Sequence, residues 1–72
     1  MENVPMIAVT VNGEEHQLPP ETTMSDLLES MQVNSRYCAI ECNQELVPRE
    51  THASTTLQDG DQVEIVTLVG GG

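Results

Sequence analysis

The chain has 72 residues, 38% of them hydrophobic, with one tyrosine and neither phenylalanine nor tryptophan. This length predicts a single domain with a small aliphatic core, which leaves little room to enclose a substrate and argues against a self-sufficient enzyme. Twelve acidic residues against two basic ones give a formal net charge of −10, so nucleic-acid binding and attraction to anionic membranes are disfavoured, and the acids serve either solubility or a partner with a basic surface.

Residues 7–18 predict a β-hairpin. Apolar side chains alternate with smaller or polar ones over residues 7–11, as in a half-buried strand. Asn12-Gly13 favours a tight turn because both residues tolerate positive φ. The alternation resumes in a short returning strand over residues 14–18.

Residues 21–33 predict a helix of about three turns. Thr22 or Thr23 can cap its N-terminus, and Asp26 stands close to the position that a capping box requires. Four apolar residues at helical spacing form one stripe, which we expect to pack in the core. The stripe consists of Met24, Leu27, Leu28 and Met31.

The second half of the chain predicts two strands and a short extra one between them. Residues 38–42 form the third strand, and a turn at Asn43-Gln44 leads to a short strand around Leu46. An irregular or helical segment follows over residues 48–54. A tight Asp-Gly-Asp turn then precedes the last strand, which spans residues 62–69.

This order of elements predicts an α+β fold, in which one main helix covers one face of a small mixed sheet of four to five strands. A right-handed crossover places the first and last strands side by side in the centre. That arrangement is the β-grasp, or ubiquitin-like, fold. We expect residues 1–69 to form the β-grasp domain and residues 70–72 to form a flexible glycine tail.

The cysteines and histidines do not predict a metal site. Cys38 and Cys42 lie four positions apart on an extended strand, which separates their sulfurs by more than about a dozen Å. Buried, apolar thiols are favoured over a catalytic Cys–His pair, which the spacing leaves open. His16 and His52 are interpreted as ordinary surface residues. Two cysteines, no apolar run of membrane-spanning length and no leader predict a cytoplasmic protein.

The last strand is apolar on both faces toward its end. Either Val63, Ile65 and Thr67 face the core, or Val66 and Leu68 do. In the first case Val66 and Leu68 are exposed, and we expect them to dock a partner. The alternative is a central strand that is buried on both faces.

The sequence resembles the ThiS family of sulfur carrier proteins of thiamine biosynthesis. The resemblance lies in residues 39–50, AIECNQELVPRE, and residues 57–72, LQDGDQVEIVTLVGGG, and more loosely in the first strand and the helix. Gly71 matches the penultimate glycine of the family, and Gly70 lengthens the tail. The resemblance implies that the carboxylate of Gly72 carries the chemistry.

According to this resemblance, an E1-like adenylating enzyme consumes ATP to activate Gly72, and a cysteine desulfurase system supplies the sulfur for a thiocarboxylate. Thiazole synthase then takes the sulfur for the thiazole ring. The chain itself would bind no cofactor and no metal. It would act as a co-substrate rather than an enzyme, and as a monomer when free.

Three other interpretations fit the same fold. The small subunit of molybdopterin synthase uses the same terminal chemistry within a stable complex. A ubiquitin-like modifier is joined to lysines of target proteins. An interaction module would carry a tail without chemical use. The fate of Gly72 separates the first two, because it becomes a thiocarboxylate in one and an isopeptide in the other.

Overall fold

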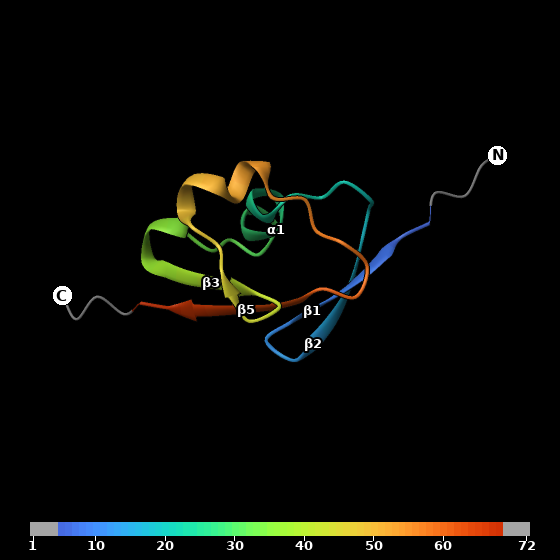
Figure 1. The fold of residues 1–72 in the computed structure, drawn as a ribbon, viewed down its shortest axis with the longest axis horizontal. Coiled ribbons are helices and arrows are strands. Elements are labelled where there is room, and N and C mark those ends of the chain that lie inside the picture. The colour runs from blue at the N-terminus through green and yellow to red at the C-terminus, as the bar shows by residue number, and fades with distance from the viewer. Residues whose placement is uncertain (1–4, 69–72) are drawn as a thin grey trace.

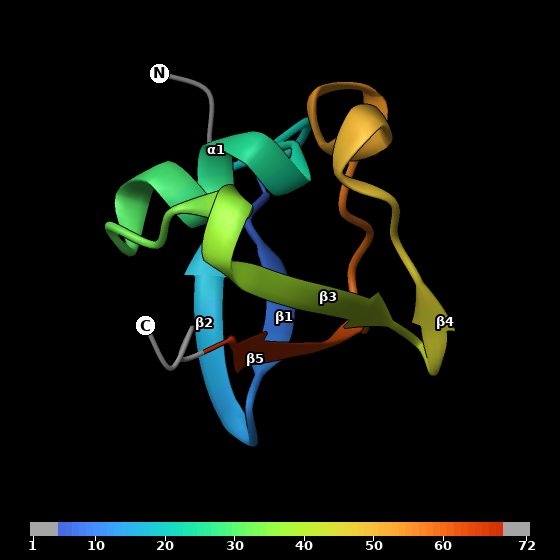
Figure 2. The ribbon, with the colours of Figure 1, turned by 90° about the vertical axis from the view of Figure 1, so that its left-hand side faces the viewer.

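The computed structural model describes residues 5–68 and contains one mixed sheet. Its strands are β1 (Ile7–Val11), β2 (Glu14–Leu18), β3 (Cys38–Cys42), β4 (Glu45–Leu46) and β5 (Gln62–Thr67). Their order across the sheet is β2-β1-β5-β3-β4, in which β1 and β5 are parallel and the other neighbours antiparallel (Figure 2). The prediction that the first and last strands lie together in the centre is therefore confirmed.

The helical segments lie on one face of this sheet. They are the α-helix α1 (Met24–Ser30) and the 3₁₀ helices η1 (Ser35–Tyr37) and η2 (Arg49–Ser54). Figure 1 shows α1 and η2 above the sheet, with β1, β3 and β5 beneath them. This is the predicted α+β arrangement. Within residues 5–68, no helix is long and apolar enough to cross a membrane.

The space between α1 and the sheet is filled by aliphatic side chains, as the composition predicts. The buried apolar residues are Val9, Val11, Met24, Leu27, Leu28, Ile40, Leu57 and Val63. They come from α1, from the three central strands and from the segment before β5. When the partly buried residues are included, β1, β3 and β5 each turn alternate residues toward the helix, which fixes the sheet face that meets it.

The helix begins with the predicted capping box. The Thr23 hydroxyl accepts a 3.1 Å hydrogen bond from the amide of Asp26, whose carboxylate accepts one of 3.1 Å from the amide of Thr23. Each side chain thus bonds a main-chain amide at the start of the helix, where amides lack partners within the helix.

The helix is shorter than predicted and ends at Ser30. Gln32 takes the left-handed conformation, with φ of 60°, and its amide donates to the carbonyl of Glu29 at 3.1 Å. The amide of Val33 donates to the carbonyl of Leu28 at 2.9 Å. These two bonds form a Schellman motif, which stops the helix although no glycine marks the position.

Two predicted side-chain placements are wrong. Met31, assigned to the core stripe, follows the last helical residue and is exposed. His52, assigned to the surface, is only 3% exposed. Its Nε2 lies 3.1 Å from the carbonyl oxygen of Val47, to which an Nε2–H group can donate a hydrogen bond. His16 is half-buried, with its Nε2 3.6 Å from the Glu14 carboxylate.

Candidate functional site

The two faces of β5 have different environments. Val63 is buried and Ile65 is partly buried against the core. Val66 and Leu68 are exposed, at 58% and 52%. The first of the two predicted orientations is therefore correct, except that Thr67 is exposed as well. Docking by Val66 and Leu68 stays a prediction. Gly70, Gly71 and Gly72 lie outside the described residues.

The face of the sheet opposite α1 combines apolar and acidic groups around β5. We call Ala39, Val66 and Leu68 the outer patch. Val66 pairs with Ala39 of β3, and the amide of Leu68 donates to the carbonyl of Tyr37 at 2.6 Å, which continues the ladder. Both α1 and η2 lie on the other face (Figure 1), so neither of them covers the outer patch.

Two carboxylates stand beside the outer patch. Glu41 of β3 and Glu64 of β5 are directly opposite each other, and both are exposed. Like charges at paired positions destabilise a sheet. A partner that brings basic side chains to this surface would relieve that repulsion and be attracted by the net charge of the chain.

Asn43 and the Asp-Gly-Asp turn, which contribute to the resemblance to the family, hold the start of β5 through hydrogen bonds. The side-chain amide of Asn43 donates to the Asp61 carboxylate at 2.9 Å, and the side-chain oxygen of Asn43 accepts from the main-chain amide of Gln62 at 3.0 Å. The Asp59 carboxylate accepts from the amide of Ala8 at 2.7 Å. Together these contacts tie the start of β5 to β1 and to the turn after β3.

Asn12, predicted only as a turn residue, also bonds β5. Its φ of 50° confirms the turn conformation. Its side-chain oxygen accepts from the amide of Ile65 at 2.8 Å, and its side-chain amide donates to the carbonyl of Ile65 at 3.2 Å. Sequence reasoning missed this role because the Asn-Gly pattern is fully accounted for by the turn.

The two cysteines are half-buried and pack against the core from β3, in line with the apolar interpretation. Burial raises the pKa of the Cys38 thiol. Burial, with the Asp61 and Glu45 carboxylates as further causes, raises the pKa of Cys42 to about 11. Both thiols therefore stay protonated at neutral pH and are poor nucleophiles. Within residues 5–68, no group of three potential metal ligands is close enough to hold an ion.

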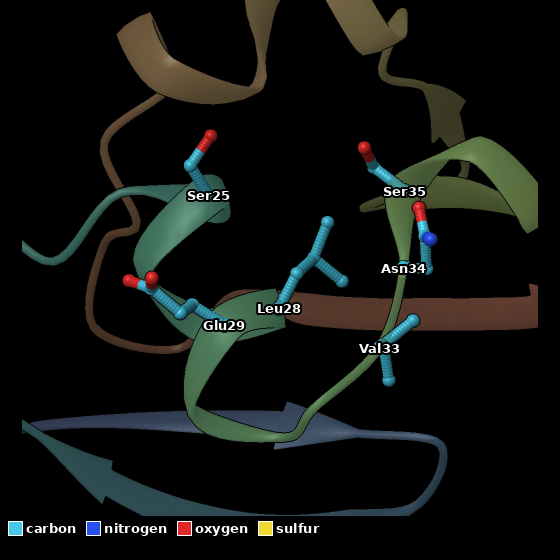
Figure 3. Close-up of a pocket in the computed structure, with 6 residues that line it drawn as sticks. All are labelled: Ser25, Leu28, Glu29, Val33, Asn34 and Ser35. Atoms are coloured by element: carbon cyan, nitrogen blue, oxygen red, sulfur yellow. The ribbon is translucent and has the colours of Figure 1, made fainter.

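A solvent-open pocket lies beside the C-terminal end of α1, away from the outer patch. It is lined by Ser25, Leu28, Glu29, Val33, Asn34 and Ser35 (Figure 3). Leu28 and Val33 are the two residues joined by the Schellman motif, so the pocket follows from the way the chain leaves the helix. Its single carboxylate and two hydroxyls do not form an acid–base or nucleophilic arrangement.

Comparison with known proteins places the chain in a family. The ThiS family matches residues 7–72. The sulfur carrier protein ThiS of Bacillus subtilis is 36% identical over 63 residues, covering 86% of this chain and 96% of that protein. A thiazole synthase of Paramagnetospirillum magneticum is 41% identical over 64 residues, which are 89% of this chain but only 20% of that protein.

A solved structure agrees with these sequence matches. The crystal structure of the thiamine biosynthesis protein ThiS from Geobacter metallireducens superimposes with a TM-score of 0.78 at 33% identity, covering 92% of this chain and all of that one. The fold is therefore the predicted β-grasp fold, and the chain belongs to the ThiS family.

Proposed function

We propose that this protein carries sulfur for thiamine biosynthesis as a thiocarboxylate on Gly72. The match of residues 7–72 to the ThiS family carries the proposal, since it includes the terminal glycines. The similarity to a sulfur carrier of Bacillus subtilis along nearly the whole of both chains supports it. The protein then acts as a co-substrate in the cytoplasm and binds no cofactor of its own.

The chemistry suits a bare terminal carboxylate. A carboxylate is a poor electrophile, so an E1-like partner first joins it to the AMP portion of ATP and releases pyrophosphate. A persulfide formed by a cysteine desulfurase then attacks the acyl adenylate and AMP leaves. A thiol such as free cysteine cleaves the resulting acyl disulfide, which releases the thiocarboxylate and leaves a disulfide. The partner provides the ATP site, and this chain provides the carboxylate. Glycines without Cβ atoms fit a narrow active-site channel at Gly70, Gly71 and Gly72.

The outer patch provides the docking surface in this proposal. The exposed side chains of Val66 and Leu68 give apolar area immediately before the tail, and Glu41 and Glu64 give charge for orientation. Because Val66 and Leu68 shortly precede the glycine tail in the chain, docking of the patch fixes the starting point of the tail.

Thiazole synthase is the proposed acceptor of the sulfur. In Paramagnetospirillum magneticum, a protein named thiazole synthase contains a segment 41% identical to this chain. Two activities held in one polypeptide meet at high effective concentration. We infer that thiazole synthase is the enzyme that takes the sulfur from this chain.

The test reconstitutes sulfur transfer with purified components. The protein is incubated with an E1-like adenylating enzyme, a cysteine desulfurase, cysteine and ATP, and its C-terminal peptide is mapped by mass spectrometry. Replacement of one oxygen by sulfur at Gly72 is expected, and it should disappear when ATP is omitted or Gly72 is deleted. A Gly72 carboxylate that stays unmodified in the complete mixture would refute the proposal.

A further inference from the structure

We propose that Asn12 is a positioning residue for sulfur transfer. It holds β5 at Ile65 and thereby sets the direction in which the C-terminal segment leaves the sheet. The inference rests on the proposed function, since it concerns how the terminal carboxylate is presented to the adenylating enzyme.

The Asn12 side chain forms the pair of hydrogen bonds with β5 that the main chain of a neighbouring strand would otherwise form. The Asn12 side chain accepts from the Ile65 amide at 2.8 Å and donates to the Ile65 carbonyl at 3.2 Å. Its own main-chain amide donates to the carbonyl of Val63 at 2.9 Å. One residue thus satisfies three main-chain groups on the same edge of β5.

These bonds fall where the parallel strand pairing ends. β1 pairs with β5 only at Thr10↔Gln62 and Val11↔Val63, and the chain then turns at Gly13. Main-chain groups of alternate residues face the same edge of a strand, so Ile65 would otherwise face solvent there. Within residues 5–68, no strand pairs with that edge of β5 beyond Val63. The Asn12 carboxamide extends the hydrogen bonding along this edge of β5 by two further bonds, both to Ile65.

The consequence concerns the step after docking. Without Asn12, the end of β5 is held only by β3, and a segment held on one edge samples more orientations. The exposed Val66 and Leu68 would still bind the partner. The tail would then reach the productive geometry in a smaller fraction of complexes. This lowers the rate of the reaction within the complex and leaves the formation of the complex unchanged.

Two substitutions separate the turn from the carboxamide. Asn12→Gly keeps a residue suited to positive φ and removes both side-chain bonds. Asn12→Asp keeps an acceptor for the Ile65 amide but places a second oxygen against the Ile65 carbonyl. The control is Thr23→Ala, which removes the helix cap on the opposite side of the core and leaves β5 untouched.

The experiment measures kcat and KM for thiocarboxylation of each variant by the adenylating enzyme with ATP and a sulfur donor. Asn12→Gly is expected to lower kcat about 5- to 10-fold and to change KM less than about twofold. The kcat of Asn12→Asp should lie between that of Asn12→Gly and that of the wild type. Amide exchange at Ile65, followed by NMR, should be faster in Asn12→Gly and unchanged in Thr23→Ala.

The outcomes separate the two proposals. If wild type is modified at Gly72 and Asn12→Gly keeps the wild-type kcat, the role of Asn12 is refuted and sulfur transfer stands. An equal loss of kcat in Thr23→Ala would likewise refute it, because general destabilisation would explain the loss. If wild type accepts no sulfur, the proposed function fails, and the role of Asn12 fails with it.

Discussion

The side chains of Asn43 and Asp61, 18 residues apart, are joined by a 2.9 Å hydrogen bond that closes the start of β5 against the turn after β3. The other Asp61 oxygen accepts from the amide of Gln58 at 2.8 Å, so the carboxylate is bonded on both sides. These residues contribute much of the resemblance to the family, and their hydrogen bonds hold the start of β5 in place.

Asn43→Gly tests this structural role. Glycine adopts the φ of 54° found at Asn43, so the substitution removes the side-chain bonds without straining the turn. We expect a loss of about 1–2 kcal/mol in the free energy of unfolding, measured by urea denaturation. Gln44→Gly is the control, because Gln44 has a φ of 71° in the same turn. It should stabilise the protein, and a loss of stability in both variants would contradict the account.

Gln32→Gly is expected to stabilise the protein by about 0.5–1 kcal/mol. Gln32 occupies the left-handed position of the Schellman motif, which favours glycine. The same substitution in the exposed strand position Gln17 should destabilise by a similar amount, because glycine weakens a strand. Thermal unfolding of both variants checks the opposite signs, and a common sign would show that backbone conformation does not decide the effect.

The order of strands and helix followed from the sequence because alternation, helical spacing and turn residues marked the elements in turn. The alternation in residues 7–11 and the Asn12-Gly13 turn indicated a hairpin, and the threonines before Asp26 indicated the start of the helix but left Thr22 and Thr23 as alternative caps. The end of the helix escaped prediction because Gln32 gives no sign of a left-handed conformation. The burial of His52 was not predicted because the short 3₁₀ helix η2 has too few apolar residues to indicate which side faces the core.

The site was only partly predictable for a related reason. The apolar residues on both faces of the last strand indicated an exposed patch, but they left two orientations open until the burial of Val63 and the exposure of Val66 and Leu68 were known. The side-chain bonds from Asn12 to Ile65 span a sequence separation of 53 residues. A local sequence pattern cannot predict a hydrogen bond between residues so far apart in the chain.

Glu64→Lys should raise stability and impair function together. It replaces the repulsion between Glu64 and Glu41 by an attractive cross-strand pair, expected to stabilise by about 0.5 kcal/mol. The same change inverts the charge beside the outer patch, so KM for the adenylating enzyme should rise. Glu15→Lys on β2 is the control with an identical change in net charge. An equal rise in KM for both variants would show that net charge, rather than this surface, guides docking.

The raised pKa of Cys42 predicts that stability falls at alkaline pH. The folded-state pKa of about 11 lies above the ordinary value of 9.0, so the folded state keeps the proton longer than the unfolded state. The corresponding stabilisation is complete below pH 9 and is lost between about pH 9 and 11. Urea denaturation across this range should show a smaller decline in Cys42→Ala than in wild type. Parallel curves would contradict the assignment.

The most direct test of the sulfur-carrier account is the intact mass of the protein after incubation with the adenylating enzyme, ATP, cysteine and a cysteine desulfurase, followed by mapping of its C-terminal peptide. Mapping is required because oxidation of a methionine adds nearly the same mass as exchange of oxygen for sulfur. The account predicts a sulfur atom in place of one carboxylate oxygen at Gly72. A carboxylate that remains unmodified, or a Gly72 joined to a lysine of another protein, would contradict it.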